Sequence, residues 1–353
     1  MQFGLSQEQI LLQDNVNRFL DDNSALDRVR TYADGGEDAD IWAGLAELGI
    51  PALLIPEAQG GIGLQPLDAA IVAECLGSHI APTPFLESAV MAPTALVASG
   101  GDHDELLAEI AAGTTRIGIA FGEAIKRRNN AGVTVKDGRM SGTSMYAFDA
   151  EANAYLVADQ HQHIYLVRAD DPGLKRSHLA TVDKTRRTVE LNYDNVTADL
   201  VSDDASVFTA TVDIGRMALA ADTLGAAQNM LDQAVEYAKQ REQFNRPIGS
   251  FQAVKHMCAE MAAQLEPCRS MVWFAGHALA ELPEESRITA CHTKAHLAEV
   301  GQFIAKTSTE VHGGMGFTDL VGLHYRLKRI GANRQRLGAP EFVREEAAIL
   351  QGI

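Results

Sequence analysis

An arginine, an aromatic residue and two glutamines stand close together in this chain at places where no packing rule demands them. They are Arg241, Gln243, Phe244 and Gln252, within the stretch YAKQREQFNRPIGSFQAVKH at residues 237–256. An arginine keeps its charge at any working pH and offers a planar fork of donors that suits a pyrophosphate. Arg241 is therefore a candidate for binding a phosphorylated ligand, with a solvated charge near a helix end as the alternative. For Phe244 the alternative is a place in the core.

A pair of glycines, Gly313 and Gly314, stands in a second string, VHGGMGFT at residues 311–318. The apolar period before this string predicts a helix over residues 284–311, so the pair follows a helix end. Because glycine has no side chain, backbone amides there can approach a phosphate or an adenine ring closely.

The overall composition is that of an ordinary globular protein. Of 353 residues, 46% are hydrophobic and 22% are charged, and no apolar run approaches the roughly 18 residues of a membrane helix. The start MQFGLSQE has no basic region followed by an apolar one, which predicts a cytoplasmic protein without a secretion signal. The net charge of −17 argues against a nucleic-acid partner, so any anionic ligand must be held locally.

Cysteines and histidines do not form a metal-site pattern. Cys75, Cys258, Cys268 and Cys291 lack the paired spacing of a zinc site and the density of a disulfide scaffold, which predicts small buried thiols in a reducing compartment. Two histidines, at positions 292 and 296, are four residues apart on a predicted helix, but no third ligand is evident. The sequence therefore predicts no metal site.

Apolar periodicity divides the chain into helices, then strands, then helices. The first part predicts helices over 6–29, with Ser6 as N-cap, and over 38–48, 67–76, 87–99 and 104–112, with a shaped Pro/Gly loop at 49–63. β-type runs follow at 116–120, 132–135, 154–157, 163–167 and 187–191, and they predict a small antiparallel sheet or barrel. From about residue 206 the helical period returns, with a long helix that Pro247 ends and bundle-length helices over 251–280 and 284–311.

The expected fold class is therefore α+β, with three domains. They are an N-terminal helical domain (1–115), a small middle β-barrel or sheet domain (116–205) and a C-terminal helical bundle (206–353).

Several strings follow one another in an order that a known family shares. WAGLAELGI (42–50), IPEAQGG (55–61) and ECLG (74–77) come first, residues 237–252 match Y-x-x-x-R-x-Q-F-G-x-P-I-x-x-F-Q, and residues 311–318 match V-H-G-G-x-G-F-T. With its order of elements, the chain resembles the acyl-CoA dehydrogenase family of flavoenzymes over nearly its whole length. The resemblance implies a C-terminal four-helix bundle and FAD as cofactor.

The resemblance also implies roles for single residues. It assigns Arg241 to the FAD pyrophosphate, with Gln243, Phe244 and Gln252 flanking the nucleotide. It places the segment that holds Glu310, Val311, Gly313 and Gly314 against FAD bound mainly to a neighbouring subunit, which implies an oligomer. Glu310 departs from the family, which generally has glutamine there, and Asn245 replaces the usual glycine.

Larger departures occur where the family holds the flavin ring and the substrate. A family string like A-x-T-E-P-x-x-G-S-D corresponds here to AFGEAIKRRNN at residues 120–130, in which only Glu123 clearly remains. Lys126, Arg127 and Arg128 of this loop could meet an anionic CoA phosphate, and a solvated basic loop is the alternative.

The catalytic base is the decisive test of the resemblance. The family's reaction removes an α-proton from an acyl thioester while a hydride passes from the β-carbon to the flavin, and the base is a carboxylate. Family members place it either just before an arginine in the first bundle helix or in a C-terminal loop of the form Y-E-G-T. These places hold Gly215, before Arg216, and Leu337, in the loop RLGA at 336–339. Neither residue can abstract a proton.

Two glutamates remain as weak candidates for a relocated base, Glu123 and Glu341. The alternative for Glu341, with Glu345 and Glu346, is the exposed face of a terminal helix. Arg216 either shapes the pocket or forms a structural salt bridge.

Some members of the family consist of two different chains, one with the flavin-ring pocket and base and the other with the adenine and pyrophosphate contacts. Such enzymes are linked with sterol side chains and other bulky acyl-CoA thioesters, and this chain resembles the second type. We therefore expect a subunit of a heteromeric FAD-dependent acyl-CoA dehydrogenase, with a homologous partner in an α2β2 assembly and an electron-transfer flavoprotein as acceptor. A self-sufficient homo-oligomer with a relocated base and a flavin-free scaffold subunit are the alternatives.

Overall fold

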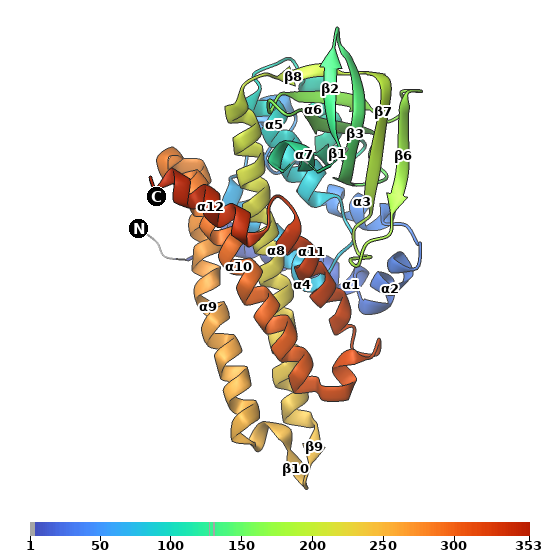
Figure 1. Cartoon of the computed structure of the whole chain (residues 1–353). Coiled ribbons are helices and arrows are strands. Elements are labelled where there is room, and N and C mark those ends of the chain that lie inside the picture. Colours follow the sequence, from blue (N-terminus) through green and yellow to red (C-terminus); the bar gives the residue numbers. More distant parts are fainter. Residues whose placement is uncertain (1–3, 127, 130) are drawn as a thin grey trace.

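The computed structural model describes residues 4–126, 128–129 and 131–353, and it has helices at both ends of the chain and a sheet between them (Figure 1). The N-terminal helices are α1 (Gln7–Asn23), α2 (Leu26–Ala33), α3 (Ala39–Glu47), α4 (Pro66–His79), the π-helix η3 (Phe85–Met91), α5 (Ala92–Ala98) and α6 (Asp104–Ala111). Ser6 caps α1 as predicted, because its hydroxyl accepts from the backbone N–H of Gln9 at 3.2 Å. The helix predicted over 6–29 is in fact two helices, since residues 24–25 between them are not helical.

The Pro/Gly segment at 49–63 forms a shaped loop, as predicted. It contains the short 3-10 turns η1 (Ile50–Ala52) and η2 (Glu57–Gln59). A side chain at Gly61 would collide with the loop, since a Cβ there would lie 1.9 Å from the carbonyl oxygen of Ile55.

Eight strands form one mixed sheet. They are β1 (Ile117–Ala120), β2 (Gly132–Lys136), β3 (Arg139–Phe148), β4 (Ala154–Ala158), β5 (Ile164–Arg168), β6 (Leu174–Leu179), β7 (Thr188–Thr197) and β8 (Asp199–Ser202). The order across the sheet is β6-β7-β3-β1-β4-β5-β8, and β2 pairs with β3. The expected antiparallel arrangement is wrong at one pair, because β1 and β4 run parallel. The long crossover through α7 (Gly122–Ile125), β2 and β3 lets β4 return in the direction of β1.

The C-terminal part is built from long helices. They are α8 (Ala205–Gln240), α9 (Gln252–Glu281), α10 (Pro283–His312), α11 (Leu323–Gln335) and α12 (Pro340–Leu350). α8 ends at Gln240 and not at Pro247, which instead lies in a two-stranded hairpin of β9 (Glu242–Gln243) and β10 (Arg246–Pro247). In the described chain, no helix is both long enough and apolar enough to cross a bilayer.

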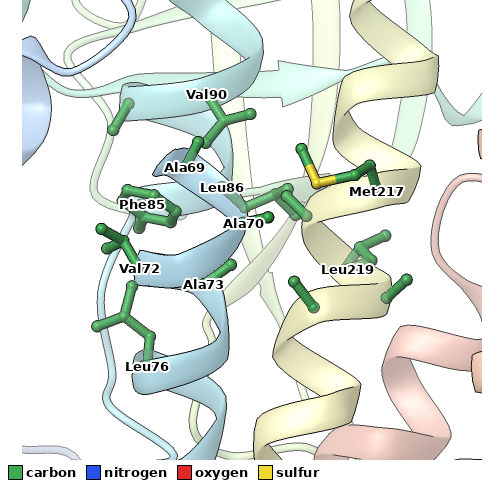
Figure 2. Close-up of a cluster of buried hydrophobic side chains, with 14 of the residues drawn as sticks. Ala69, Ala70, Val72, Ala73, Leu76, Phe85, Leu86, Val90, Met217 and Leu219 are labelled. Carbon is green, nitrogen blue, oxygen red and sulfur yellow. The ribbon is translucent and has the colours of Figure 1, made fainter. Parts of the chain in front are cut away.

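Close packing of α4 on α8 joins the two helical parts. Figure 2 shows apolar side chains of α4 and η3 facing Met217 and Leu219 of α8. Two glycines permit the approach: a Cβ at Gly225 would lie 1.9 Å from the carbonyl oxygen of Glu74, and one at Gly77 would lie 2.0 Å from that of Asp222. Backbone therefore contacts backbone at this crossing.

A buried ionic cluster ties the sheet side to the bundle. The carboxylate of Asp222 on α8 accepts from Arg186 Nη2 at 2.7 Å and from Arg329 Nη2 at 2.6 Å, and Asn333 Nδ2 donates to it at 2.6 Å. Burial alone would raise the pKa of Asp222, but the two guanidinium groups outweigh it and lower the pKa to about 2.

The fold class is confirmed: a helical N-terminal part, a central sheet and a helical C-terminal part. The domain boundaries near residues 115 and 205 stay a prediction. Three cysteines, Cys75, Cys268 and Cys291, are buried free thiols as expected, whereas Cys258 is half-buried.

Candidate functional site

The predicted pyrophosphate ligand, Arg241, is the residue that follows α8. Its backbone N–H donates to the carbonyl of Tyr237 at 2.8 Å, and its own carbonyl accepts from Ile248 N–H at 2.7 Å. The backbone is therefore held at both sides while the guanidinium is exposed. Among the described residues the Arg241 side chain has no hydrogen-bond or ion-pair partner, so its donors are free for a ligand.

Phe244 is at the tip of the β9–β10 hairpin and is 86% exposed, which excludes the core alternative. Phe244 and Asn245 have φ values of 54° and 59°, as in the two-residue turns that right-handed strand twist favours. Asn245 tolerates this backbone region, but an aromatic residue rarely adopts it. The hairpin therefore holds an exposed ring on a strained backbone, and this ring contacts Phe251 edge-on with 6.0 Å between centroids.

The second predicted motif lies beside the first. The rings of Tyr237 and His312 stack with centroids 4.6 Å apart, which joins the last turn of α8 to the last turn of α10. Gly313 ends α10 with a φ of 57°, a conformation that glycine adopts without cost. Gly313 and Gly314 are exposed, and a Cβ built on either would meet nothing within 4 Å. Their backbone is open to a ligand.

The remaining predicted contact residues differ in exposure. Gln243, Gln252 and Glu310 are exposed, so the Glu310 carboxylate can stay in solvent. Val311 is 6% exposed and its side chain packs in the main core, so it offers no apolar surface to a ligand.

This end of the bundle fits the pyrophosphate and adenine end of FAD. It combines an unpaired exposed guanidinium at Arg241, an exposed aromatic face at Phe244 and open backbone at Gly313 and Gly314.

A cavity of about 460 Å³ lies between the sheet and the α11–α12 connection, and none of the predicted FAD-contact residues lines it. Its walls include Phe121 and Phe148 on the sheet side and Leu337 and Phe342 on the helical side. Lys126, Arg128 and Arg336 also line it, whereas no aspartate or glutamate of the described residues does. Arg127 of the predicted basic loop lies outside the described residues.

The two places where the family carries its base meet at the wall of this cavity. A Cβ on Gly215 would lie 2.6 Å from Leu337 Cδ1 and 2.9 Å from Met91 Sδ. Leu337 is buried, and its carbonyl accepts from Arg216 Nε at 3.0 Å. The ends of two apolar side chains therefore occupy the space beside Gly215, and neither base position holds a carboxylate.

Arg216 has the structural role that was one of its two predicted alternatives. Its guanidinium is buried and forms ion pairs with Asp213, at 3.5 Å, and with Glu346. The expected exposure of Glu346 is wrong, since pairing with Arg216 and with Arg287 leaves its side chain 22% exposed. Burial raises the pKa of Asp213 to about 7, although Arg216 and Arg287 oppose the rise.

Neither weak candidate for a relocated base lines the cavity. Glu341 pairs with Arg334 at 2.8 Å and its side chain is 67% exposed. A backbone hydrogen bond at the start of α12 and the Arg334 pair lower its pKa. Glu123 is buried, and its Oε1 accepts from Arg128 Nη1 at 2.8 Å and from Met145 N–H at 3.3 Å.

Sequence reasoning missed the arrangement of Arg336. This residue precedes Leu337 in the predicted base loop, and its guanidinium stacks over the ring of Phe148 at 4.7 Å from the centroid. The two residues are far apart in sequence, and the only local signal was an arginine where the family string has a tyrosine.

Comparisons with known proteins agree with this arrangement of elements. Models of the acyl-CoA dehydrogenase N-terminal and C-terminal domains match residues 6–114 and 205–348. The chain is 31% identical over 318 residues to the acyl-CoA dehydrogenase IpdE2 of Mycobacterium tuberculosis, covering 90% of this chain and 88% of that protein.

Two solved structures show the same fold over nearly the whole chain. A ChsE4-ChsE5 complex from Mycobacterium tuberculosis has a TM-score of 0.90 and 26% identity, covering 100% of this chain and 99% of that chain. A variant of the Tcur3481-Tcur3483 steroid ACAD has a TM-score of 0.89 and 26% identity, covering 98% of each chain. The resemblance is thereby confirmed, and with it FAD as the cofactor. The chain belongs to the acyl-CoA dehydrogenase family of oxidoreductases.

Proposed function

We propose that this chain is a subunit of a heteromeric FAD-dependent acyl-CoA dehydrogenase. In this proposal it supplies the pyrophosphate and adenine contacts, while a homologous partner chain supplies the flavin-ring pocket and the catalytic base. One observation carries the proposal: both base positions meet in space, and they hold Gly215 and Leu337, with the side chain of Met91 beside them, so neither position provides a carboxylate.

The comparisons add support for the partner and the substrate class. Two of the similar structures are named as pairs of chains, and one of them is named a steroid ACAD. We therefore propose a bulky acyl-CoA thioester, such as one with a steroid side chain, as substrate. An α2β2 assembly with an electron-transfer flavoprotein as acceptor completes the proposal, and a structure whose name includes an electron-transferring flavoprotein shares the fold.

Within such a complex this chain's own residues bind and orient. Arg241 holds the pyrophosphate by charge-assisted hydrogen bonds, and Phe244 presents a flat face at the hairpin tip. The backbone at Gly313 and Gly314 admits the adenine end without steric hindrance. FAD, when bound, supplies the hydride acceptor for α,β-dehydrogenation of the thioester.

The test is purification of this chain alone and together with the product of its neighbouring gene. We expect FAD and dehydrogenase turnover only in the complex, at one flavin per pair of chains. One flavin per chain with turnover by the lone chain would favour the self-sufficient homo-oligomer. A complex without flavin would favour the scaffold alternative.

Arg241→Ala tests the site itself. We expect the variant complex to lose FAD by about tenfold or more in affinity, because charged hydrogen bonds to phosphate are lost. The melting temperature of the variant chain alone should not change, since the exposed wild-type side chain has no hydrogen-bond or ion-pair partner among the described residues. Arg18→Ala, which removes another exposed arginine, on α1, is the matched control. Normal flavin content in Arg241→Ala would refute the assignment.

A further inference from the structure

The cavity beside Leu337 has a composition that the proposed function does not explain. Its volume of about 460 Å³ falls within the roughly 300–1,000 Å³ of small-molecule sites. Apolar and aromatic side chains form most of the wall, and every ionisable side chain in the lining except that of Tyr146 is a cation. In a protein of net charge −17, a recess whose described lining has three cations and no carboxylate favours anions.

Arg336 is the central cation of this recess. It is half-buried, stacks on Phe148 at 4.7 Å and donates one hydrogen bond, from Nη2 to Thr188 Oγ1 at 3.3 Å. A guanidinium has five N–H donors, so most of its donors remain available. Within the described chain no carboxylate forms an ion pair with Arg336. Neighbouring arginines do have such partners: Arg334 pairs with Glu299 and Glu341, Arg216 with Asp213 and Glu346, and Arg186 with Asp222.

A carboxylate that attracts Arg336, that of Glu87, does not line the cavity. Glu87 of η3 is buried, is absent from the lining and forms no ion pair with Arg336 within the described residues. Burial raises its pKa to about 7, with Asp149 adding to the rise and Arg336 opposing it. The Arg336 guanidinium therefore has no direct ion-pair partner among the described residues, and a ligand carboxylate would accept two parallel hydrogen bonds from it.

The other two cations differ in their freedom. Arg128 is engaged, because it pairs with Glu123 at 2.8 Å and lies 5.1 Å from the Tyr146 ring centroid. Lys126 is exposed and has no hydrogen-bond or ion-pair partner in the described ranges. The recess therefore offers one oriented guanidinium, at Arg336, and one exposed ammonium group, at Lys126.

The α11–α12 connection is held in place before any ligand binds. Arg216 Nε donates to Leu337 O at 3.0 Å, and Lys294 Nζ donates to the carbonyls of Arg334 and Gly338 at 3.2 Å each. Preorganisation of this kind lowers the entropic cost of binding. Leu337 lies between the cavity and Gly215, and a volume of about 460 Å³ suits a compact ligand.

We propose that this cavity binds a compact apolar monocarboxylate, whose carboxylate pairs with Arg336 and whose body lies between Phe148 and the α11–α12 connection. The site is distinct from the bundle-end FAD contacts, and it stands whether or not a partner chain completes the proposed enzyme.

The test is titration of the purified chain, alone and in complex with its partner, with 2-naphthoate and with its neutral isostere 2-naphthamide. We expect saturable binding of the acid and binding of the amide weaker by about tenfold or more, because a charged hydrogen-bonded pair is lost. Equal binding of acid and amide, or no binding of the acid, would overturn the proposal. A third titration, with a naphthyl CoA thioester, distinguishes a phosphate-bearing ligand from a free acid. If the thioester bound more tightly than the acid, and Arg336 substitution left that binding unchanged, the proposal would also be overturned.

Substitutions locate the bound acid. Arg336→Gln should weaken 2-naphthoate binding by about tenfold or more, and Arg336→Lys should weaken it less because it keeps charge without the fork. Arg344→Ala, which removes an exposed arginine of α12 outside the lining, should leave binding unchanged. Melting temperatures verify that each variant is folded. Unchanged binding in folded Arg336→Gln, or displacement of the acid by stoichiometric FAD, would contradict the assignment.

Discussion

At the scale of single residues, the loss of a base is a matter of space as well as of residue type. Gly215 alone would suggest that one mutation could restore a glutamate. The structure shows that Leu337 and Met91 already occupy the volume beside it. A glutamate at Gly215 would therefore displace the ends of the Leu337 and Met91 side chains, because interiors are close-packed.

The most perturbed lysine near this place is Lys294, which is buried under the α11–α12 connection. Burial, with repulsion from Arg216 and Arg334, lowers its pKa to about 7. Between about pH 7 and the ordinary value of 10.5 the unfolded chain binds a proton there that the folded chain does not. The contribution of Lys294 to the free energy of unfolding must therefore rise with pH across this window, by at most about 1.4 kcal/mol per pH unit.

Lys294→Met tests this prediction. The measurement is the free energy of unfolding in urea. We expect the value for the wild type minus that for the variant to increase from neutral to alkaline pH. Lys239→Met, at an exposed position on α8, should leave the pH dependence of the wild type unchanged. A wild-type-minus-variant difference that is flat with pH would show that Lys294 titrates normally.

At the scale of elements, the crossing of α4 and α8 depends on two glycines. Because a Cβ at Gly225 would lie 1.9 Å from the Glu74 carbonyl oxygen, Gly225→Ala must separate two backbones. We expect a loss of about 3 kcal/mol in the free energy of unfolding. The matched control is Gly331→Ala on α11, where a Cβ meets nothing within 4 Å and the helix should gain up to about 1 kcal/mol. Similar stabilities of the two variants would contradict the claim that the α4–α8 crossing requires glycine at position 225.

The apolar pattern of the sequence predicted the long helices better than the strands of the sheet. Periodicity predicted the long bundle helices well, because each buries a continuous face. It missed β3, which carries glycine and serines, and β6, an edge strand with exposed Lys175 and Arg176. Such strands are held by neighbouring strands and not by their own apolar pattern.

At the scale of the whole molecule, the Asp222 cluster joins the segment before β7 to α8 and α11. Asp222→Asn would leave Arg186 and Arg329 buried without their carboxylate, and we expect a loss of about 3–5 kcal/mol. Since the pKa of Asp222 is about 2, against an ordinary 3.8, its stabilisation is present above pH 3.8 and is lost as pH falls toward 2.

Acid unfolding measures this contribution. The wild type should lose more stability between about pH 4 and pH 2 than Asp222→Asn does. Asp232→Asn, whose exposed carboxylate lies on the same helix, should behave as the wild type. If the free energy of unfolding fell equally with pH in Asp222→Asn and in the wild type, the Asp222 cluster would not be the main cause of acid unfolding.

The sequence by itself determined the family, the α, β, α order, the motifs with Arg241 and Gly313, and the lack of a glutamate at positions 215 and 337. These follow from local strings and from apolar periods, which need no knowledge of distant contacts. Only the tertiary structure decided that Gly215 and Leu337 touch, that Arg216 is a buried structural cation and that β1 runs parallel to β4. It also decided that Arg336 lines a largely apolar cavity and pairs with no carboxylate of the described residues. Each of these joins residues far apart in sequence, and packing of the folded chain, not local spacing, sets which of them meet.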